Sequence, residues 1–232
     1  MLMFLGRGSA FTNAHNCAYF VNNNDLILLD CPASAFENIK KLHLEKFHHI
    51  YILVTHTHGD HIGGVGTMLQ YAYFVLQNPL TVVAPSRAVL EDLSLLLYQI
   101  EGCEKNWFYL ITADNLEKSW LMCAIPTQHV EPLKNKCFGY ALYVNHHKII
   151  YTGDTATLMP YVPYLQQGTI LYTECSVFQS NVHLYLPDIL PILTAFTEKD
   201  IQVYLMHLDD EKQISSMIEH TKIQLAPLSE SY

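Results

Sequence analysis

The segment from residue 55 to residue 61, Thr-His-Thr-His-Gly-Asp-His, constrains this chain more than any other, because it holds four metal-binding side chains in close succession. Residues 49–54 before it are mostly apolar and β-branched, which predicts a buried strand. The glycines that follow Ile62 open a stretch expected to form a helix. The segment is therefore predicted to be a strand-to-helix loop, where backbone turns can direct successive side chains to different places.

The four metal-binding side chains of this loop divide into two pairs. His56 and His58 are two residues apart and can converge on one ion, whereas Asp60 and His61 can face a second ion nearby. Imidazole suits zinc, iron or nickel, and a carboxylate adds a hard ligand compatible with zinc, iron or manganese. A histidine-rich loop without a metal is the alternative, and the ligand types found later in the chain make it the weaker interpretation.

Three later positions each follow an apolar run and precede polar or turn residues: His129, Asp154 and His207. A single histidine after an apolar strand is more often a structural residue than a ligand. Three such positions after this loop favour a site built at the ends of several strands.

The loop resembles the His-x-His-x-Asp-His signature of the metallo-β-lactamase superfamily, and the three later positions match, in order, its third histidine, bridging aspartate and last histidine. The resemblance covers nearly the whole chain. It implies an α+β fold, a four-layer αββα sandwich of two mixed β-sheets with helices on the outer faces, as one domain over residues 1–232. It also implies two divalent metal ions, of which Zn²⁺ is the first expectation and Fe or Mn the alternatives. One ion would be held by His56, His58 and His129, and the other by Asp60, His61 and His207. Asp154 would bridge them.

Three segments resemble a branch of that superfamily, the ribonuclease Z-like phosphodiesterases. Residues 5–11, Leu-Gly-Arg-Gly-Ser-Ala-Phe, are similar to the glycine-rich opening of that branch, and His15 stands where it has arginine. Residues 172–178 resemble its His-Glu-Ala-Thr-Phe motif if one residue is inserted, and His183 falls where it carries a histidine. The resemblance implies that Glu174 orients a His183 imidazolium that protonates the leaving oxygen. A structural carboxylate and an ordinary loop histidine are the alternatives.

The chain departs from the ribonuclease Z enzymes that process tRNA. These carry a long basic arm between the third histidine and the bridging aspartate, but here only a turn and two predicted strands separate His129 from Asp154. The net charge is −9, whereas proteins that bind polyanions normally cluster Lys and Arg. Long structured RNA is therefore not the expected partner, and a small phosphodiester or nucleotide, such as a cyclic nucleotide, fits better.

These features predict a binuclear metal-dependent hydrolase, in the first place a phosphodiesterase. Two cations would lower the pKa of a shared water towards about 7, so that hydroxide could attack phosphorus, and Asp60 could orient the nucleophile or accept its proton. The alternative is a carbonyl hydrolase, a lactonase or thioesterase, that uses the same ligands without Glu174 and His183. A zinc β-lactamase is disfavoured because it places cysteine where Asp154 stands. A non-catalytic scaffold is disfavoured because such proteins normally lose ligands.

Composition agrees with a compact enzyme. The chain has 232 residues, of which 50% are hydrophobic, enough to bury the core of one domain. Its first residues hold only a short apolar run without a basic leader, and no stretch approaches the length of a membrane span, so neither a signal peptide nor a membrane contact is expected. The 6 cysteines show no paired spacing, which predicts reduced thiols in a cytoplasmic protein. A homodimer is compatible with the resemblance, because dimers are common in that branch.

Overall fold

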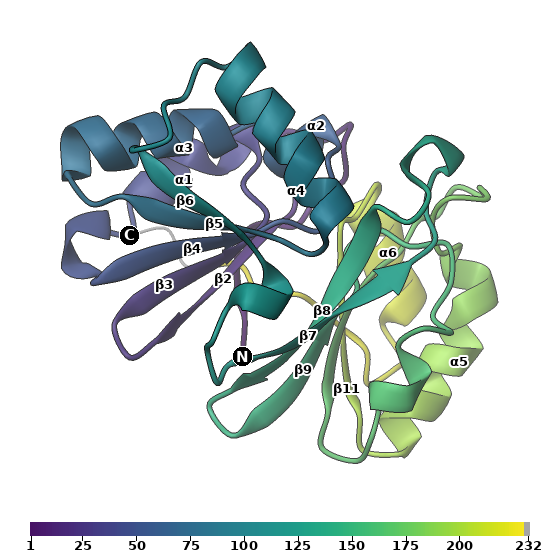
Figure 1. Ribbon diagram of the computed structural model, residues 1–232. Helices are drawn as coiled ribbons and strands as arrows, with labels where there is room; N and C mark the ends of the chain where they lie inside the picture. Colours follow the sequence, from purple (N-terminus) through teal and green to yellow (C-terminus); the bar gives the residue numbers. More distant parts are fainter. Residues whose placement is uncertain (230–232) are drawn as a thin grey trace.

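The structure, a computed structural model, describes residues 1–229. Two six-stranded β-sheets pack face to face, and helices cover the outer face of each sheet (Figure 1). The predicted αββα sandwich is therefore confirmed. The first half of the chain forms one sheet with α1, α3 and α4 outside it, and the second half forms the other sheet with α5 and α6 outside it.

The first sheet has the strand order β1-β2-β3-β4-β5-β6. Its strands are β1 (Met3–Gly6), β2 (Cys17–Asn22), β3 (Asp25–Leu29), β4 (His49–Leu53), β5 (Leu80–Ala84) and β6 (Phe108–Thr112). Its helices are α1 (Phe36–Lys40), α2 (Gly59–Ile62), α3 (Val65–Tyr71) and α4 (Arg87–Ser94), with π-helical turns at Ala72–Leu76 and Leu95–Ile100 and 3₁₀ turns at Ala33–Ala35, Leu44–Lys46 and Ala113–Asn115.

The second sheet has the order β12-β11-β10-β9-β8-β7. Its strands are β7 (Leu121–Thr127), β8 (Cys137–Val144), β9 (His147–Tyr151), β10 (Ile170–Glu174), β11 (Gln202–Met206) and β12 (Gln224–Leu225). Its helices are α5 (Leu186–Glu198) and α6 (Glu211–Ile218), with 3₁₀ turns at Glu131–Leu133 and Val162–Tyr164. Among the described residues, no helix combines the length and the apolar character that crossing a membrane requires.

The two sheets share one topology. In the first, β2 is antiparallel to both neighbours and β3 to β6 are parallel; in the second, β8 is antiparallel to both neighbours and β9 to β12 are parallel. All strands except β2 and β8 therefore run the same way within their sheet. The loops that follow these strands meet at one edge of each sheet, which is where open α/β sheets bind ligands.

Successive strand residues serve different cores. Leu28 and Ile52 pack under the helices of the first sheet, whereas the next residues, Leu29 and Leu53, point into the core between the sheets. Leu171 similarly packs under the helices of the second sheet. Because side chains alternate along a strand, strands covered on both faces must be apolar at every position, which explains the continuous hydrophobic runs of the sequence.

Residues 34–46 do not form one continuous helix. The helix α1 covers only Phe36–Lys40, and His43 takes a left-handed conformation (φ 56°) that a right-handed helix cannot continue through. The short edge strand β12 was not anticipated, because two residues carry no periodicity. Leu93 of α4 and Leu97 of the π-helical turn that follows it are fully buried in the core under these helices.

Candidate metal centre

The predicted 55–61 loop ends at His58, because helix α2 begins at Gly59 and includes Asp60 and His61. The segment is held in shape by Asp30, a fully buried carboxylate just after β3. Its two oxygens accept the Thr55 backbone N–H (2.8 Å) and the Thr55 hydroxyl (2.9 Å), and Nδ1 of His61 lies 2.8 Å from Oδ2. Since Nδ1 of His61 donates to Asp30, the lone pair on Nε2 is left free to face the site. Asp30 is therefore a brace for the loop.

The first group of ligand atoms combines the loop with the second half of the chain. Nδ1 of His58 lies 2.9 Å from Nε2 of His56 and 3.4 Å from Nε2 of His129. Asp154 Oδ2 lies 3.8 Å from Nε2 of His56 and 3.8 Å from Nε2 of His129. His129 is oriented from behind, because its Nδ1 donates to the Val182 carbonyl at 2.7 Å.

The second group shares Asp154 with the first. Asp60 Oδ2 lies 3.3 Å from Nε2 of His61 and 3.2 Å from Nε2 of His207. Asp154 completes it, with Oδ1 3.3 Å from Nε2 of His61 and Oδ2 3.4 Å from Nε2 of His207. The structure thus brings all seven predicted residues together as two four-residue groups joined through Asp154, the arrangement expected from the resemblance.

The donor set and its spacing fit two metal ions. A tetrahedral zinc with bonds of about 2.1 Å requires ligand atoms about 3.4 Å apart. The distances given above, 2.9–3.8 Å, bracket that value, and all ligand atoms of each group lie within 4.8 Å of one another. Nε2 of His61 and Oδ1 of Asp154 are buried, and among the described residues neither has a hydrogen-bond partner. Buried polar atoms normally have partners, so a cation between them would satisfy both.

The charges agree with this assignment. Burial, together with the charge of His61, lowers the pKa of His56 well below its usual value, which keeps this imidazole neutral as a ligand must be. Burial would raise the pKa of Asp154, but His207 and His61 outweigh it and lower that pKa well below the ordinary range. Burial likewise opposes ionisation of Asp60, yet hydrogen bonds from His207 and His61 lower its pKa. Burial opposes the charged form of His61, but Asp154 and Asp30 outweigh burial and raise its pKa well above the usual value, so a charged His61 and a neutral His56 face the two ionised carboxylates.

Three strand ends bend through the left-handed region to reach the centre. Asp30 (φ 62°) follows β3, Gly153 (φ 60°) precedes Asp154 after β9, and His207 (φ 53°) follows β11. Such values are uncommon outside glycine. At Gly153 a Cβ would lie 2.6 Å from the Phe138 carbonyl oxygen, so only glycine fits there. These bends turn the chain out of each strand so that the polar side chains face one another.

Glu174 and His183 also lie next to each other, beside the second group. Nδ1 of His183 is 3.2 Å from Oε1 of Glu174, and the His183 ring stacks on His207 with centroids 5.4 Å apart. The same Oε1 accepts the backbone N–H groups of Thr155 (3.1 Å) and Leu184 (3.2 Å). Glu174 is fully buried, so it is no surface carboxylate. Burial disfavours the His183 imidazolium, but the hydrogen bond and charge of Glu174 outweigh burial and raise the pKa of His183 to about 9.

Asp209 holds the loop between Glu174 and His183, a role that the sequence did not indicate. Its carboxylate accepts the Ser176 hydroxyl at 2.5 Å and the Val177 N–H at 3.1 Å. No sequence signal separates it from Asp210, which instead accepts the Gln213 N–H and caps α6. His15, which replaces the branch's arginine, does not join the groups of potential metal ligands in the described chain.

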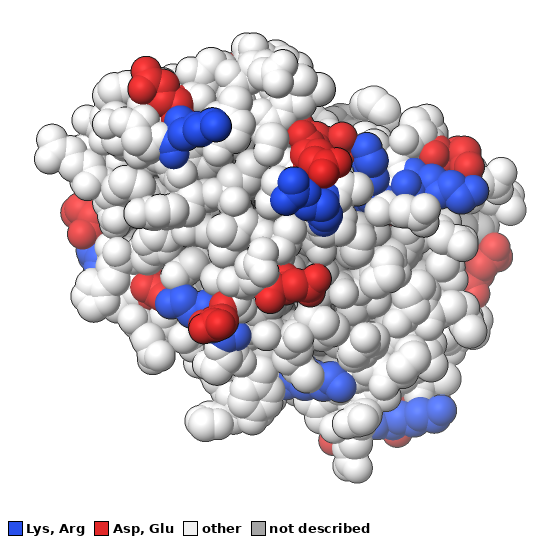
Figure 2. All heavy atoms as spheres, viewed as in Figure 1, with Lys and Arg blue, Asp and Glu red and all other residues white. Residues whose placement is uncertain are grey.

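Surface charge agrees with a small substrate. On the face shown in Figure 2, Lys and Arg side chains are interspersed with Asp and Glu and form no basic patch. The loosely clustered Lys134 and Lys136 are each paired with a carboxylate, of Glu131 (3.0 Å) and Asp92 (2.7 Å).

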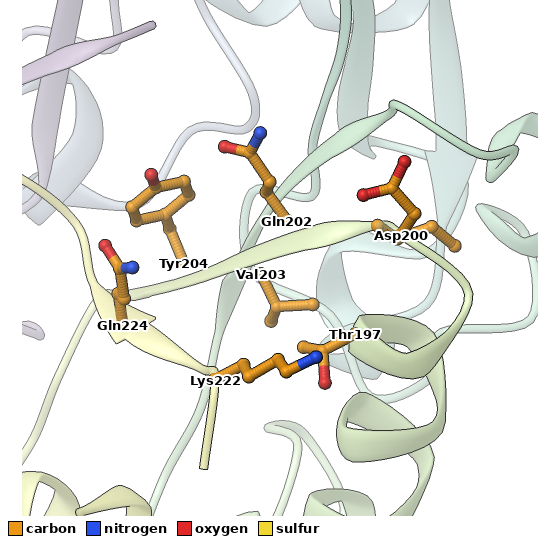
Figure 3. A pocket seen from close by; sticks show the side chains of 8 residues that line it. Thr197, Asp200, Gln202, Val203, Tyr204, Lys222 and Gln224 are labelled. Carbon is orange, nitrogen blue, oxygen red and sulfur yellow. The ribbon is translucent and has the colours of Figure 1, made fainter.

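A separate hollow of about 190 Å³, which includes Gln202 and Lys222 (Figure 3), lies at the beginning of β11, the end of that strand opposite His207.

The whole chain, residues 1–232, matches a family model described as "Anti-Pycsar protein Apyc1". An anti-Pycsar protein Apyc1 from Bacillus phage 010DV004 is 27% identical over 239 residues, covering 91% of this chain and 90% of that protein. A protein of the same description from Paenibacillus xerothermodurans is 28% identical over 238 residues, covering 91% of this chain and 89% of that protein. A ribonuclease Z from Methanosarcina mazei is 27% identical over 156 residues, covering 62% of this chain and 48% of that protein.

Solved structures share the fold. The metallo-β-lactamase fold protein YhfI from Bacillus subtilis superposes with a TM-score of 0.76 at 16% identity, covering 97% of this chain and 95% of that one. Human tRNase Z, short form, superposes with a TM-score of 0.66 at 20% identity, covering 98% and 96%. The metallo-β-lactamase fold and the similarity to the ribonuclease Z-like branch are thereby confirmed. The fold and the His/Asp cluster together support a metal-dependent hydrolase.

Proposed function

Because the chain belongs to the anti-Pycsar protein Apyc1 family, and because Glu174 and His183 lie beside its His/Asp cluster, we propose that it is a metal-dependent phosphodiesterase of small phosphodiesters, in the first place cyclic nucleotides. His56, His58 and His129 would hold one divalent ion, Asp60, His61 and His207 the other, with Asp154 between them. Zinc suits these ligands, and iron or manganese is compatible. Two such ions would supply an activated water and positive charge beside the phosphate.

The Glu174–His183 pair is the observation that carries the choice of phosphodiester. Opening a cyclic nucleotide breaks a P–O bond, and the departing ribose alkoxide must gain a proton. His183 uses Nδ1 for Glu174, so Nε2 is the atom that would donate. With its pKa raised to about 9, the imidazole carries that proton at neutral pH. Carbonyl hydrolases that expel better leaving groups do not need this pair, which is why it favours a phosphodiester.

Asp60 would act on the opposite side of the reaction. It lies in the second group of ligand atoms, and the hydrogen bonds from His207 and His61 keep its carboxylate ionised. An ionised carboxylate there can orient the attacking water and accept its proton. In this proposal a proton leaves the water towards Asp60 and another reaches the leaving oxygen from His183, so the reaction is balanced.

The substrate is proposed to be small. The connection between His129 and Asp154 consists of one 3₁₀ turn and the hairpin of β8 and β9, with no inserted arm. The cavity beside His183 and His207 has a volume of about 250 Å³, just below the range of about 300–1,000 Å³ that is usual for small-molecule sites. The description of the family points the same way, since action against Pycsar suggests cyclic nucleotides.

A hydrolysis panel tests this proposal. Protein stripped with a chelator and reloaded with zinc or manganese would be offered 3′,5′-cyclic nucleotides, bis-p-nitrophenyl phosphate, a lactone, a thioester, nitrocefin and precursor tRNA. We expect cyclic nucleotides to be the best substrates and precursor tRNA to be poor. Asp154→Ala protein is the control for contaminating hydrolases. Strong lactonase or thioesterase activity with negligible phosphodiesterase activity would overturn the proposal in favour of a carbonyl hydrolase.

A further inference from the structure

A cavity of about 250 Å³ opens beside His183 and His207, and two loops form its walls. Residues 9–11, after β1, form one wall, and residues of the 174–180 segment, at the end of β10, form the other. Each loop places a phenylalanine at the cavity. Phe11 is 102% exposed and Phe178 is 67% exposed, although both are large apolar side chains. Exposed apolar groups that border a cavity mark binding surfaces more often than isolated ones do.

The loop that carries Phe11 is tied to the metal-proximal end of β11. The Ser9 N–H donates to the Leu208 carbonyl at 2.9 Å, directly after His207. The Ser9 carbonyl in turn accepts the Thr12 hydroxyl at 2.8 Å and the Thr12 N–H at 3.1 Å, which closes a tight turn around Phe11. Phe11 therefore stands at the tip of a braced turn next to the proposed metal centre.

The loop that carries Phe178 is braced as well. The Phe178 N–H donates to the Ser176 hydroxyl at 2.9 Å, and that hydroxyl donates to Asp209. The Ser180 hydroxyl accepts the His183 N–H at 3.1 Å. The carboxylate of Asp209 and the hydroxyls of Ser176 and Ser180 thus hold the loop itself. The cavity consequently offers aromatic faces at its mouth, while these polar groups are already engaged.

We propose that Phe11 and Phe178 hold the nucleobase of a cyclic mononucleotide by stacking, while its phosphate lies at the metal centre beside His183. This inference rests on the proposed function and names the part of the site that recognises the base. Stacking on aromatic rings tolerates any base, because every base has a π-face. The site therefore accepts purine and pyrimidine cyclic nucleotides alike, and it discriminates against a cyclic phosphate that has no base.

The test compares Phe11→Ala and Phe178→Ala with the parent protein on cyclic AMP, cyclic CMP and the base-free methyl riboside 3′,5′-cyclic phosphate. Each variant should raise KM for both nucleotides by about tenfold, the effect of losing one stacking contact, with little change in kcat. The base-free substrate should be cut equally by all proteins. Phe11→Trp, which keeps an aromatic ring at this position, should have the same KM as the parent protein. Phe74→Ala is the matched control, since Phe74 is 60% exposed but lies in the π-helical turn after α3, outside this cavity.

Binding provides a readout independent of turnover. Titration calorimetry with a non-hydrolysable cyclic nucleotide phosphorothioate should show the same tenfold weakening in the two variants. The inference is overturned if nucleotides and the base-free substrate lose activity equally, or if the variants match the parent protein. It is also overturned if either variant changes the molecular mass in solution, because the ring would then belong to a contact between copies. A parent protein that cuts no cyclic nucleotide refutes the proposed function itself, which is a different result.

Discussion

The two halves of the molecule have the same sheet topology but deliver their site residues in different ways. The first half contributes its four potential ligands from one short segment, with His56 and His58 in the loop after β4 and Asp60 and His61 in the short helix α2. The second half contributes His129, Asp154 and His207 from the ends of three strands that are far apart in sequence. A local loop keeps its geometry through its own turn and one brace, Asp30. The dispersed residues depend on the register of the whole second sheet.

This difference separates the segment that places metal ligands from the loops that are proposed to contact the substrate. The 55–61 segment mainly places ligands, although Asp60 is also proposed to act on the attacking water. The loop after β1 adds Phe11, and the second half supplies Glu174, His183 and Phe178, because each strand end begins a loop that can vary independently. We therefore expect substitutions in the 55–61 segment to alter metal binding, and substitutions in the loop between Glu174 and His183 to alter the reaction or its substrate. Asp154, which joins both groups, should be the exception.

The largest effect is expected for Asp154→Ala, because this carboxylate belongs to both groups of ligand atoms. Purified parent protein should contain about two transition-metal equivalents, and the variant should lose most of both. Activity on every substrate should fall by about 10³-fold or more, since the ions supply several kcal/mol of transition-state stabilisation. His58→Ala, which touches one group only, should retain about one equivalent by elemental analysis. Full metal content in Asp154→Ala would contradict the shared role.

A selective effect is expected for His183→Ala. Removing a general acid should slow an alkyl or cyclic phosphodiester by about 10²–10⁴-fold, because the alkoxide leaves poorly without a proton. p-Nitrophenyl phosphodiesters should be spared, since that phenolate leaves unaided, and metal content should not change. Glu174→Gln should show the same pattern more weakly. Equal loss on both substrate types, or loss of metal, would make His183 a ligand or structural residue instead.

A smaller effect is expected for Asp30→Asn, which keeps the shape but removes the charge behind His61. Losing such a partner typically weakens metal affinity about 10- to 100-fold. Competition with a chromophoric chelator measures that change. Asp25→Asn is the matched control, because Asp25 lies at the other end of β3 and pairs with Lys118 at 3.1 Å. If the two variants lose half of their metal at the same chelator concentration, Asp30 does not support the metal site as a brace.

The smallest effect concerns pH. The proton donor is the His183 imidazolium, whose pKa burial would lower but the hydrogen bond and charge of Glu174 raise to about 9. The protonated, active form of His183 therefore predominates below that pKa and is lost as the pH rises through it. Bound cations nearby would lower the pH at which activity declines. For a cyclic nucleotide, kcat/KM should decline on the alkaline side at or below pH 9, and Glu174→Gln should shift the decline to lower pH. A p-nitrophenyl substrate should show no such alkaline decline. If the decline is identical for both substrates, it arises from the titration of another group.

The sequence by itself predicted the architecture and the ligand order, both through its resemblance to the metallo-β-lactamase superfamily. Apolar runs predicted buried strands, and polar residues directly after them predicted where a site would form. The 55–61 loop could be identified because its ligands are neighbours in the chain, so that no long-range contact is needed to interpret them. His129, Asp154 and His207 could be identified because each ends a strand, and strands that run the same way within a sheet end at the same edge.

The tertiary structure decided what depends on contacts between distant residues. Asp209 and Asp210 are identical neighbours, yet one holds the Glu174–His183 loop and the other caps α6, because successive side chains leave the backbone in different directions. Phe11 and Phe178 lie far apart in sequence, and only the docking of the β1 loop against Leu208 and of the β10 loop against Asp209 brings them to one cavity. Such pairings arise from loop closure across two sheets, for which hydrophobic periodicity carries no signal.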